Sequence, residues 1–210
     1  MLVLKRSKTR VLDKTVEGDC MPPKAKFTKE QIISKAFEIV KEEGLDALTA
    51  RYLGEKLGSS ARPIFTVFGS MDEVEEGVIK KAKQLYNEYV NRGLSYDIAF
   101  KGVGTEYIKF AMNEPKLFQM LFMTGHEGKG VDVILPIIDD NYADILKAIM
   151  TAYGIDKENA LRLYRHLWIY THGIATLCAT NTCSFSADEI SAMMTDVFLG
   201  LLKRIKEGKL

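Results

Sequence analysis

The sequence has 210 residues, enough for one sizeable globular body or for a small domain joined to a larger one. Its 29 basic and 28 acidic residues nearly cancel, so no overall field points to nucleic acid, a membrane or an acidic substrate. Any charge-based function must therefore be local. A local excess of positive charge occurs in residues 1–26, which hold seven lysines and arginines against three acidic residues. We expect these residues to form a flexible basic leader.

The three cysteines, Cys20, Cys178 and Cys183, are too few and too irregularly spaced for a disulfide framework, and no CxxC pair indicates zinc. No apolar run reaches the roughly twenty residues that a membrane span requires. We therefore expect a cytoplasmic protein that has no membrane partner, no metal site and no cofactor.

The first predicted elements are two helices. After Thr28, a plausible N-cap, apolar residues recur every three or four positions, which predicts an amphipathic helix over 28–43 that ends at Gly44. Thr49 caps a second, very short helix, which Gly58 ends.

A third short helix is predicted over 60–68. Ser60 caps it, and Pro63 falls in its first turn, where the missing N–H has no intrahelical acceptor in any case. In this helix Ile64, Phe65 and Phe68 are expected to face inward.

The opposite side of this third helix carries Ala61, Arg62 and Thr66. Two short helices joined by a Gly-Ser turn form a helix-turn-helix, whose second helix is narrow enough for the major groove of DNA. There an arginine can donate two hydrogen bonds to guanine, and a threonine can reach a phosphate or a thymine methyl. This interpretation requires an exposed Arg62 and a coiled segment over 60–68.

The rest of the chain is also predicted to be helical, and we expect an all-α fold with an N-terminal three-helix helix-turn-helix domain and a larger C-terminal helical domain. A residue before proline avoids helical angles, which separates two helices near Pro115. The glycine-rich stretch 124–130 does not have phosphate-loop spacing and is interpreted as a loop. The predicted helices are 71–91, two within 95–123, and then 131–152, 156–179 and 186–207.

The last predicted helix has an apolar surface broad enough to require partners on two sides. A four-helix contact between two copies of the chain would bury it, so we expect a homodimer through the last two helices. The expected domain boundaries are 1–26 for the leader, 27–73 for the DNA-binding domain and 74–210 for the effector-binding and dimerisation domain.

From Phe27 to about Leu85, the order of "EEG", "ALTARYLGEKLGSS" and "PIFTVFGSMDEV" resembles the N-terminal DNA-binding domain of TetR-family transcriptional repressors. The family usually has a tyrosine where Phe65 stands, a histidine at Val67 and a lysine at Met71, and these commonly touch phosphates. Here all three are apolar, which predicts weaker non-specific DNA affinity and a flatter salt dependence. Lys26 and the basic leader are candidates to compensate.

The stretch "WIYTHG" resembles the Trp-x-x-x-His-Gly signature of a TetR-family C-terminal domain, best over residues 160–180. The resemblance implies a homodimer whose larger domain binds a small-molecule effector, and whose recognition helices sit about 34 Å apart to enter successive major grooves.

Candidate site residues follow from these features. The expected contacts to a double-stranded DNA operator are Lys26, Thr49, Arg51, Ser59, Ser60, Ala61, Arg62, Phe65 and Thr66. Aromatic or polar side chains on the surrounding helices are the expected lining of the effector pocket. They are Tyr107, Phe110, Phe118, Phe122, Tyr164, Trp168 and His172. Aromatic residues at helical spacing more often belong to the core than to a pocket. A lone histidine more often forms a hydrogen bond with a neighbouring carbonyl in the core.

Two other classes of protein compete with a DNA-binding repressor. The sequence has no Gly-x-Ser-x-Gly elbow, no HExxH and no dinucleotide fingerprint after a strand, which argues against an enzyme. A helical small-molecule carrier that has lost strong DNA binding is the alternative, because Phe65, Val67 and Met71 are apolar.

Overall fold

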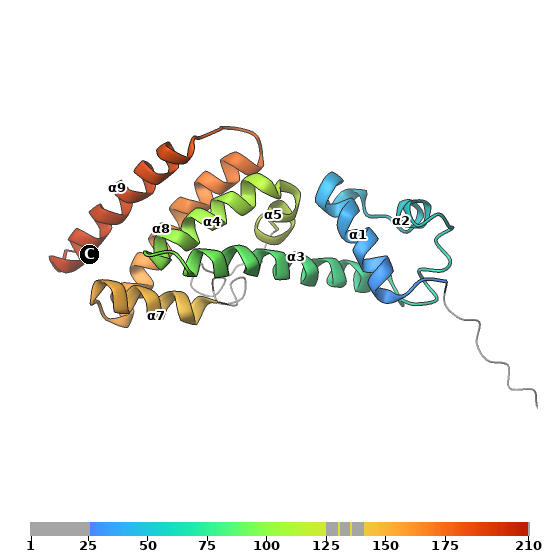
Figure 1. Ribbon diagram of the computed structural model, residues 1–210, viewed down its shortest axis with the longest axis horizontal. Helices are drawn as coiled ribbons and strands as arrows, with labels where there is room; N and C mark the ends of the chain where they lie inside the picture. The colour runs from blue at the N-terminus through green and yellow to red at the C-terminus, as the bar shows by residue number, and fades with distance from the viewer. Residues whose placement is uncertain (1–25, 125–129, 131–134, 136–140, 210) are drawn as a thin grey trace, which may run out of the picture.

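The computed structural model describes residues 26–124, 130, 135 and 141–209, and every regular element among them is a helix (Figure 1). Their order is α1 (Lys29–Glu43), the short 3-10 helix η1 (Leu45–Ala47), α2 (Ala50–Lys56), α3 (Met71–Leu94), α4 (Ala99–Asn113), α5 (Pro115–Phe122), α7 (Tyr142–Tyr153), α8 (Lys157–Ala179) and α9 (Ala187–Lys206). The predicted all-α class is confirmed. The basic leader up to residue 25, most of the loop 124–130 and the first part of the helix predicted over 131–152 lie outside the described residues.

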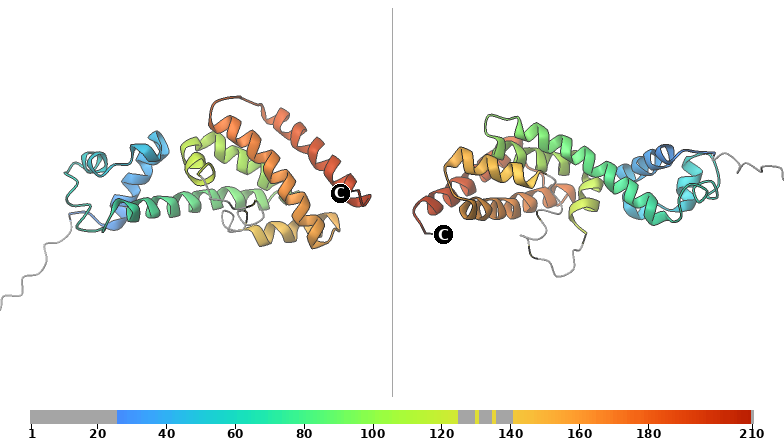
Figure 2. Two further views of the ribbon diagram at one scale, coloured as in Figure 1. Left: turned by 180° about the vertical axis from the view of Figure 1, so that it is seen from behind. Right: turned by 90° about the horizontal axis from the view of Figure 1, so that it is seen from below.

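The long helix α3 joins two groups of helices (Figures 1 and 2). α1 and α2 lie around its N-terminal end, and α4, α5, α7, α8 and α9 gather along its C-terminal part and beyond it. The molecule is therefore elongated, with a small helical group at one end.

The predicted helix starts are confirmed where a capping side chain defines them. Thr28 and Gln31 form a reciprocal capping box at α1, and Thr49 accepts a hydrogen bond from the Tyr52 N–H at the start of α2. Pro115 occupies the first turn of α5, which separates it from α4 as predicted. Ser186 begins α9 with a second capping box. These side chains satisfy N–H groups that a helix start leaves without an intrahelical acceptor.

The third helix predicted over 60–68 is wrong as an α-helix. Residues 62–67 form a run of turns, in which the N–H of Ile64 bonds to the carbonyl of Ala61 and the N–H of Val67 to the carbonyl of Ile64. A single bond of α-helical spacing, from Phe68 N–H to the Ile64 carbonyl at 2.9 Å, closes the segment. The segment is coiled, but it does not continue as an α-helix.

The inward direction predicted for this segment is confirmed for two residues and wrong for one. Ile64 is fully buried and Phe68 is buried, so both anchor the turns in the hydrophobic core. Phe65 is 47% exposed and faces solvent. Arg62 is exposed, as the DNA-binding interpretation requires.

Helices α3 and α4 approach each other closely at two glycines. A Cβ atom added to Gly102 would lie 2.1 Å from the Gly93 carbonyl oxygen, so only glycine fits at this crossing. Beside it the buried Glu106 accepts hydrogen bonds from Arg92, Tyr96 and Lys109. Burial raises the pKa of this carboxyl, but the three bonds outweigh burial and hold the pKa below its ordinary value.

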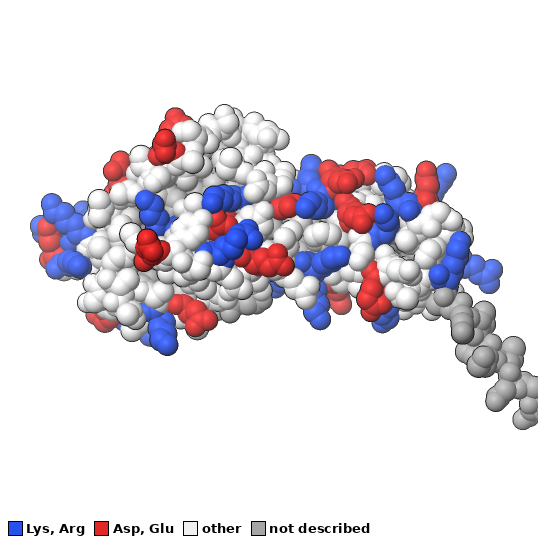
Figure 3. Space-filling model, viewed as in Figure 1, with Lys and Arg blue, Asp and Glu red and all other residues white. Residues whose placement is uncertain are grey.

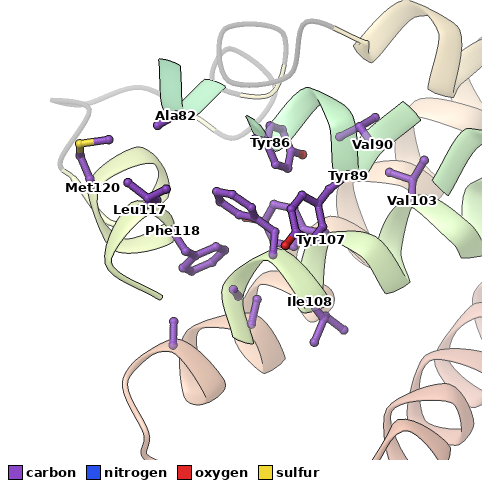
Figure 4. Packing of buried hydrophobic residues seen from close by; sticks show 14 of the residues in the cluster. Ala82, Tyr86, Tyr89, Val90, Val103, Tyr107, Ile108, Leu117, Phe118 and Met120 are labelled. Carbon is purple, nitrogen blue, oxygen red and sulfur yellow. The ribbon is translucent and has the colours of Figure 1, made fainter. Parts of the chain in front are cut away.

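An aromatic cluster fills the junction of α3, α4 and α5 (Figure 4). The ring of Tyr86 lies 5.0 Å from Phe122 and 5.4 Å from Phe110, and Tyr107 lies 5.5 Å from Phe118. All three pairs meet edge to face, the arrangement that the ring quadrupoles favour. The cluster fixes α5 against the middle of the molecule.

Candidate functional site

The predicted DNA-contacting residues all lie at the end of the molecule formed by α1, α2 and the turns before α3. Thr49 caps α2, Arg51 is exposed in its first turn, and Ser60 is exposed after it. The Lys26 ammonium donates a hydrogen bond to the Ser59 hydroxyl at 3.1 Å, so the side chain of Lys26, which precedes α1, is held beside the connection after α2.

The turns over 62–67 present a second set of predicted contacts. Arg62 and Phe65 are exposed, and Ala61 is half-buried. Thr66 is exposed and donates its hydroxyl hydrogen to the Pro63 carbonyl at 2.7 Å. The segment therefore offers solvent a guanidinium, a phenyl ring and a methyl-bearing hydroxyl side by side.

Gly54 explains how this segment lies against α2. A Cβ atom added to Gly54 would lie 2.7 Å from the carbonyl carbon of Ser60 and 2.8 Å from the nitrogen of Ala61. The absence of a side chain at Gly54 therefore allows this close approach. Val67 and Met71, at positions where the TetR family usually has histidine and lysine, are half-buried and pack against the core. Their apolar side chains are therefore used in packing.

Charge at this end is mixed. Figure 3 shows basic and acidic side chains interspersed over the visible face, including the end that holds α1 and α2. Around α2, the Tyr52 hydroxyl donates to a Glu43 carboxylate oxygen at 2.8 Å, and the Lys56 ammonium lies 3.8 Å from the same carboxylate.

A cavity of about 230 Å³ lies between α3, α4, α7, α8 and α9. Seven of its sixteen lining residues are aromatic: Tyr86, Phe100, Tyr107, Tyr153, Tyr164, Trp168 and Phe198. The other lining residues are mostly aliphatic or small, and Lys101 is the single charged one. A concave apolar site with few polar groups is typical of small-molecule binding.

Of the predicted pocket residues, Tyr107, Tyr164 and Trp168 line this cavity. Phe110 and Phe118 are fully buried in the aromatic cluster and do not line it. Periodicity placed both rings inside the protein, but it could not distinguish core from cavity wall. Phe122 is half-buried against Tyr86 in the same cluster and is likewise absent from the cavity wall.

His172 lies behind the cavity wall. Its Nδ1 is 2.9 Å from the Tyr107 hydroxyl, and its ring stacks on Trp168 at 4.8 Å between centroids. Burial lowers the pKa of His172 below its ordinary value, which favours the neutral imidazole. The histidine thus positions two wall residues, Tyr107 and Trp168.

Several wall residues were not predicted from the sequence. Lys101 and Gly104 come from α4, and Thr195 comes from α9. Thr171 stands next to His172 in the "WIYTHG" stretch, so the motif could have indicated it. The others carry no sequence signal beyond helical periodicity.

The described residues contain no group of three His, Cys, Asp or Glu side chains that could hold a metal ion. Within the same described ranges, no helix is long and apolar enough to cross a membrane.

Comparison with known proteins identifies the family. The family model described as "Tetracyclin repressor-like, C-terminal domain" matches residues 100–198, which span α4 to most of α9 and nearly all of the cavity wall. Over these residues the chain has a TetR-family C-terminal domain. Among curated proteins, the chain is 25% identical over 182 residues to a protein of Mycobacterium tuberculosis (strain ATCC 25618 / H37Rv), named as an uncharacterized HTH-type transcriptional regulator. The alignment covers 84% of this chain and 81% of that relative.

Proposed function

We propose that this TetR-family protein is a sequence-specific DNA-binding transcriptional regulator, acting as a repressor under the control of a small-molecule effector. The observation that carries the proposal is the exposed Arg62 and Thr66 on turns braced by the buried Ile64 and Phe68. The relative's description as an HTH-type transcriptional regulator supports the same function. In this proposal, residues 27–73 are the DNA-binding domain and 74–210 the effector-binding and dimerisation domain.

The exposed side chains suit direct readout of a major groove. Arg62 can donate two hydrogen bonds to O6 and N7 of guanine. Phe65 lacks the hydroxyl that a tyrosine would direct to a phosphate, but its exposed ring can contact a thymine methyl. Thr66 offers a methyl group of its own and a hydroxyl that already bonds to the backbone.

Phosphate contacts are proposed for the side chains around this reading segment. Thr49 and Arg51 at the start of α2, and Ser59 and Ser60 after it, are polar groups of the kind that position a protein on the backbone. Lys26, whose ammonium is held at Ser59, lies beside the same surface. Because Val67 and Met71 are apolar, we expect few phosphate contacts and a shallow salt dependence.

A gel-shift assay tests the proposal. The DNA is the region upstream of the coding sequence, with unrelated DNA of the same length as the reference. Arg62→Ala is expected to cost about 1–3 kcal/mol of binding free energy and to relax the preference at one base pair per half-site. Lys147→Ala, at an exposed basic residue on α7, outside α8 and α9, is the matched control and is expected to bind as the wild type does.

Two outcomes contradict parts of this proposal. An equal loss on all DNA sequences means that Arg62 contacts only phosphate. If the wild-type protein forms no sequence-selective, salt-dependent complex, the alternative function holds, a helical small-molecule carrier without strong DNA binding. Two observations favour that alternative. Residues 60–68 do not form an α-helix, and Val67 and Met71 are apolar.

The proposed effector site is the cavity between α3, α4, α7, α8 and α9. Tyr107, Tyr164 and Trp168 on its wall come from α4 and α8, the helices that pack against the rest of the molecule. A ligand there changes DNA affinity only by its differential affinity for two arrangements of these helices. We propose no catalytic role for this wall.

The proposed assembly is a cytoplasmic homodimer through α8 and α9. The exposed apolar side chain of Ile169 on α8 supports this, because a monomer would leave it in water. Two DNA-binding ends related by a two-fold axis can enter major grooves one turn apart, about 34 Å.

A further inference from the structure

We propose that the cavity selects a small aromatic carboxylate that carries a second hydrogen-bonding group, with its carboxylate at Lys101 and the second group at Thr171. The inference rests on the proposed function in one respect, since it names the chemical class of the effector. It begins from the cavity itself, whose volume of about 230 Å³ suits a small molecule.

The wall favours an aromatic body. Seven aromatic residues face the cavity, on α3, α4, α7, α8 and α9, so a planar ring finds edges and faces on several sides. Offset and edge-to-face contacts of this kind add stabilisation beyond simple area burial. Trp168 is held in one orientation by stacking on His172, so part of the wall is preorganised.

The mouth of the cavity carries a positive charge. Among its lining residues Ile98 and Leu199 are 53% and 56% exposed, and Lys101 is also exposed, so these three mark the opening. Lys101 makes no ion pair and no side-chain hydrogen bond within the part of the chain that the structure describes. Its ammonium is available to a carboxylate at the opening of an otherwise apolar site.

The start of α4 reinforces the same charge. Ile98, Phe100 and Lys101 belong to its N-cap and first turn, and Ile98 provides no side-chain cap for the first N–H groups. The partial positive charge of a helix start therefore adds to the lysine at the mouth.

Deeper in the cavity, Thr171 provides a neutral polar group. The residue is only 4% exposed and lines the cavity, and its hydroxyl has no hydrogen-bond partner among the described residues. Buried hydroxyls are generally paired, so an unpaired one facing a cavity points to a ligand group. Its Oγ1 lies 3.9 Å from the position of a Cβ atom on Gly104.

The two polar groups are arranged in line. Lys101 and Gly104 are three residues apart on α4, so they share a face with about 5–6 Å between their Cβ positions. The Met194 side chain covers Gly104, Thr171 lies next to it, and Lys101 is exposed one turn earlier on α4. A ligand with a carboxylate at one end and a hydroxyl or keto oxygen at the other matches this order, with its ring between them.

Isothermal titration calorimetry without DNA tests the proposal with three related probes. Phloretate carries both the carboxylate and a phenolic hydroxyl, para-propylphenol has no carboxylate, and hydrocinnamate has no hydroxyl. We expect phloretate to bind about tenfold more tightly than para-propylphenol and about fivefold more tightly than hydrocinnamate.

Two variants separate the two contacts. Lys101→Met is expected to remove the preference for phloretate over para-propylphenol and to keep the preference over hydrocinnamate. Thr171→Val is expected to remove the preference for phloretate over hydrocinnamate and to keep the preference over para-propylphenol. Each variant must retain one preference, so loss of the fold cannot imitate the result. Lys147→Met, an exposed lysine on α7 that does not line the cavity, is the matched control and is expected to change neither.

Equal binding of the three probes, or a preference for the carboxylate that survives Lys101→Met, overturns the inference. Failure here is distinguishable from failure of the proposed function. A protein that shifts its upstream DNA but shows no probe preference remains a regulator with another effector. A protein that prefers phloretate as expected but binds no DNA is the carrier.

Discussion

At the residue scale, glycines rather than large side chains fix the geometry of the DNA-facing end. Gly54 lies where the backbone of Ser60 and Ala61 passes over α2, and a Cβ atom there would be closer to these atoms than packed carbons ever come. Backbone cannot move aside as the tip of a side chain can. The exposure of Arg62 thus depends on a residue that has no side chain.

We predict that Gly54→Ala destabilises the fold by about 1–3 kcal/mol, because the added methyl overpacks the contact between α2 and the following turns. Urea unfolding measures the change. Gly130→Ala is the control, since a Cβ atom on Gly130 meets nothing within 4 Å, and we expect a change of at most about 0.5 kcal/mol. A Gly54→Ala protein as stable as the control would show that the turns can shift without cost.

His172 gives a second residue-scale prediction, a dependence of stability on pH. Burial lowers the pKa of His172 in the folded protein, so the unfolded chain binds this proton more readily. The stability associated with the neutral imidazole is complete above the unfolded pKa of about 6.5, and it is lost as the pH falls from there through the folded pKa.

The measurement compares the free energy of unfolding at about pH 7.5 and about pH 5.5. We expect the wild type to lose more stability over this interval than His172→Gln does. His166→Gln, on the same helix, should lose as much as the wild type. If the His172→Gln protein has an unchanged pH dependence, another group is responsible.

At the element scale, the helices were predictable where the sequence carries both a period and a cap. Thr28 and Ser186 have capping partners three residues later, so the starts of α1 and α9 could be located from the sequence. The segment 60–68 has an equally plausible cap in Ser60, but it is short and contains the β-branched Ile64, Thr66 and Val67. A short segment of weak helix formers gains few helical hydrogen bonds, so tertiary packing decides its conformation.

The cavity was less predictable than the helices, for a different reason. A helical period indicates which side chains face inward, but a void depends on how several inner faces meet. Phe118 on α5 and Tyr107 on α4 have similar patterns, yet one lies in the core and the other lines the cavity. Lys101 was missed because a lysine on a helix is usually a solvated residue.

An ion pair links α1 to the start of α5. The Lys41 ammonium of α1 lies 2.7 Å from a carboxylate oxygen of Glu114, the N-cap residue of α5. Glu114 is only 8% exposed, and its other oxygen, Oε2, has no hydrogen-bond partner among the described residues. The lysine therefore supplies the charge that a nearly buried carboxylate requires.

We predict that Lys41→Met lowers the free energy of unfolding by about 1–3 kcal/mol, because it leaves the Glu114 carboxylate buried without a partner. Lys35→Met is the control, since Lys35 pairs with Glu38 on the open surface of α1, and its effect should be below about 0.5 kcal/mol. The double variant with Glu114→Gln is expected to be more stable than Lys41→Met alone. Equal effects of the two lysine substitutions would show that this link contributes no more than a surface pair.

At the scale of the whole molecule, a single chain leaves apolar surface on α8 and α9 exposed to water. Ile169 on α8 is 49% exposed, and Gly173 lies one turn further along the same face. A Cβ atom on Gly173, or on Gly200 of α9, would meet nothing within 4 Å. An exposed apolar side chain with a glycine one turn away is suited to close approach by a second pair of helices.

We predict that Ile169→Lys converts a dimer of the wild-type protein into a monomer, because a dimer would bury the two introduced charges against an apolar face. Native mass spectrometry reads the assembly directly. Met150→Lys is the control, since it introduces the same charge at an exposed apolar position on α7, outside α8 and α9. DNA affinity should fall with the loss of the dimer, because one chain can occupy only one half-site. A dimer that persists in Ile169→Lys would place the contact between subunits on another surface.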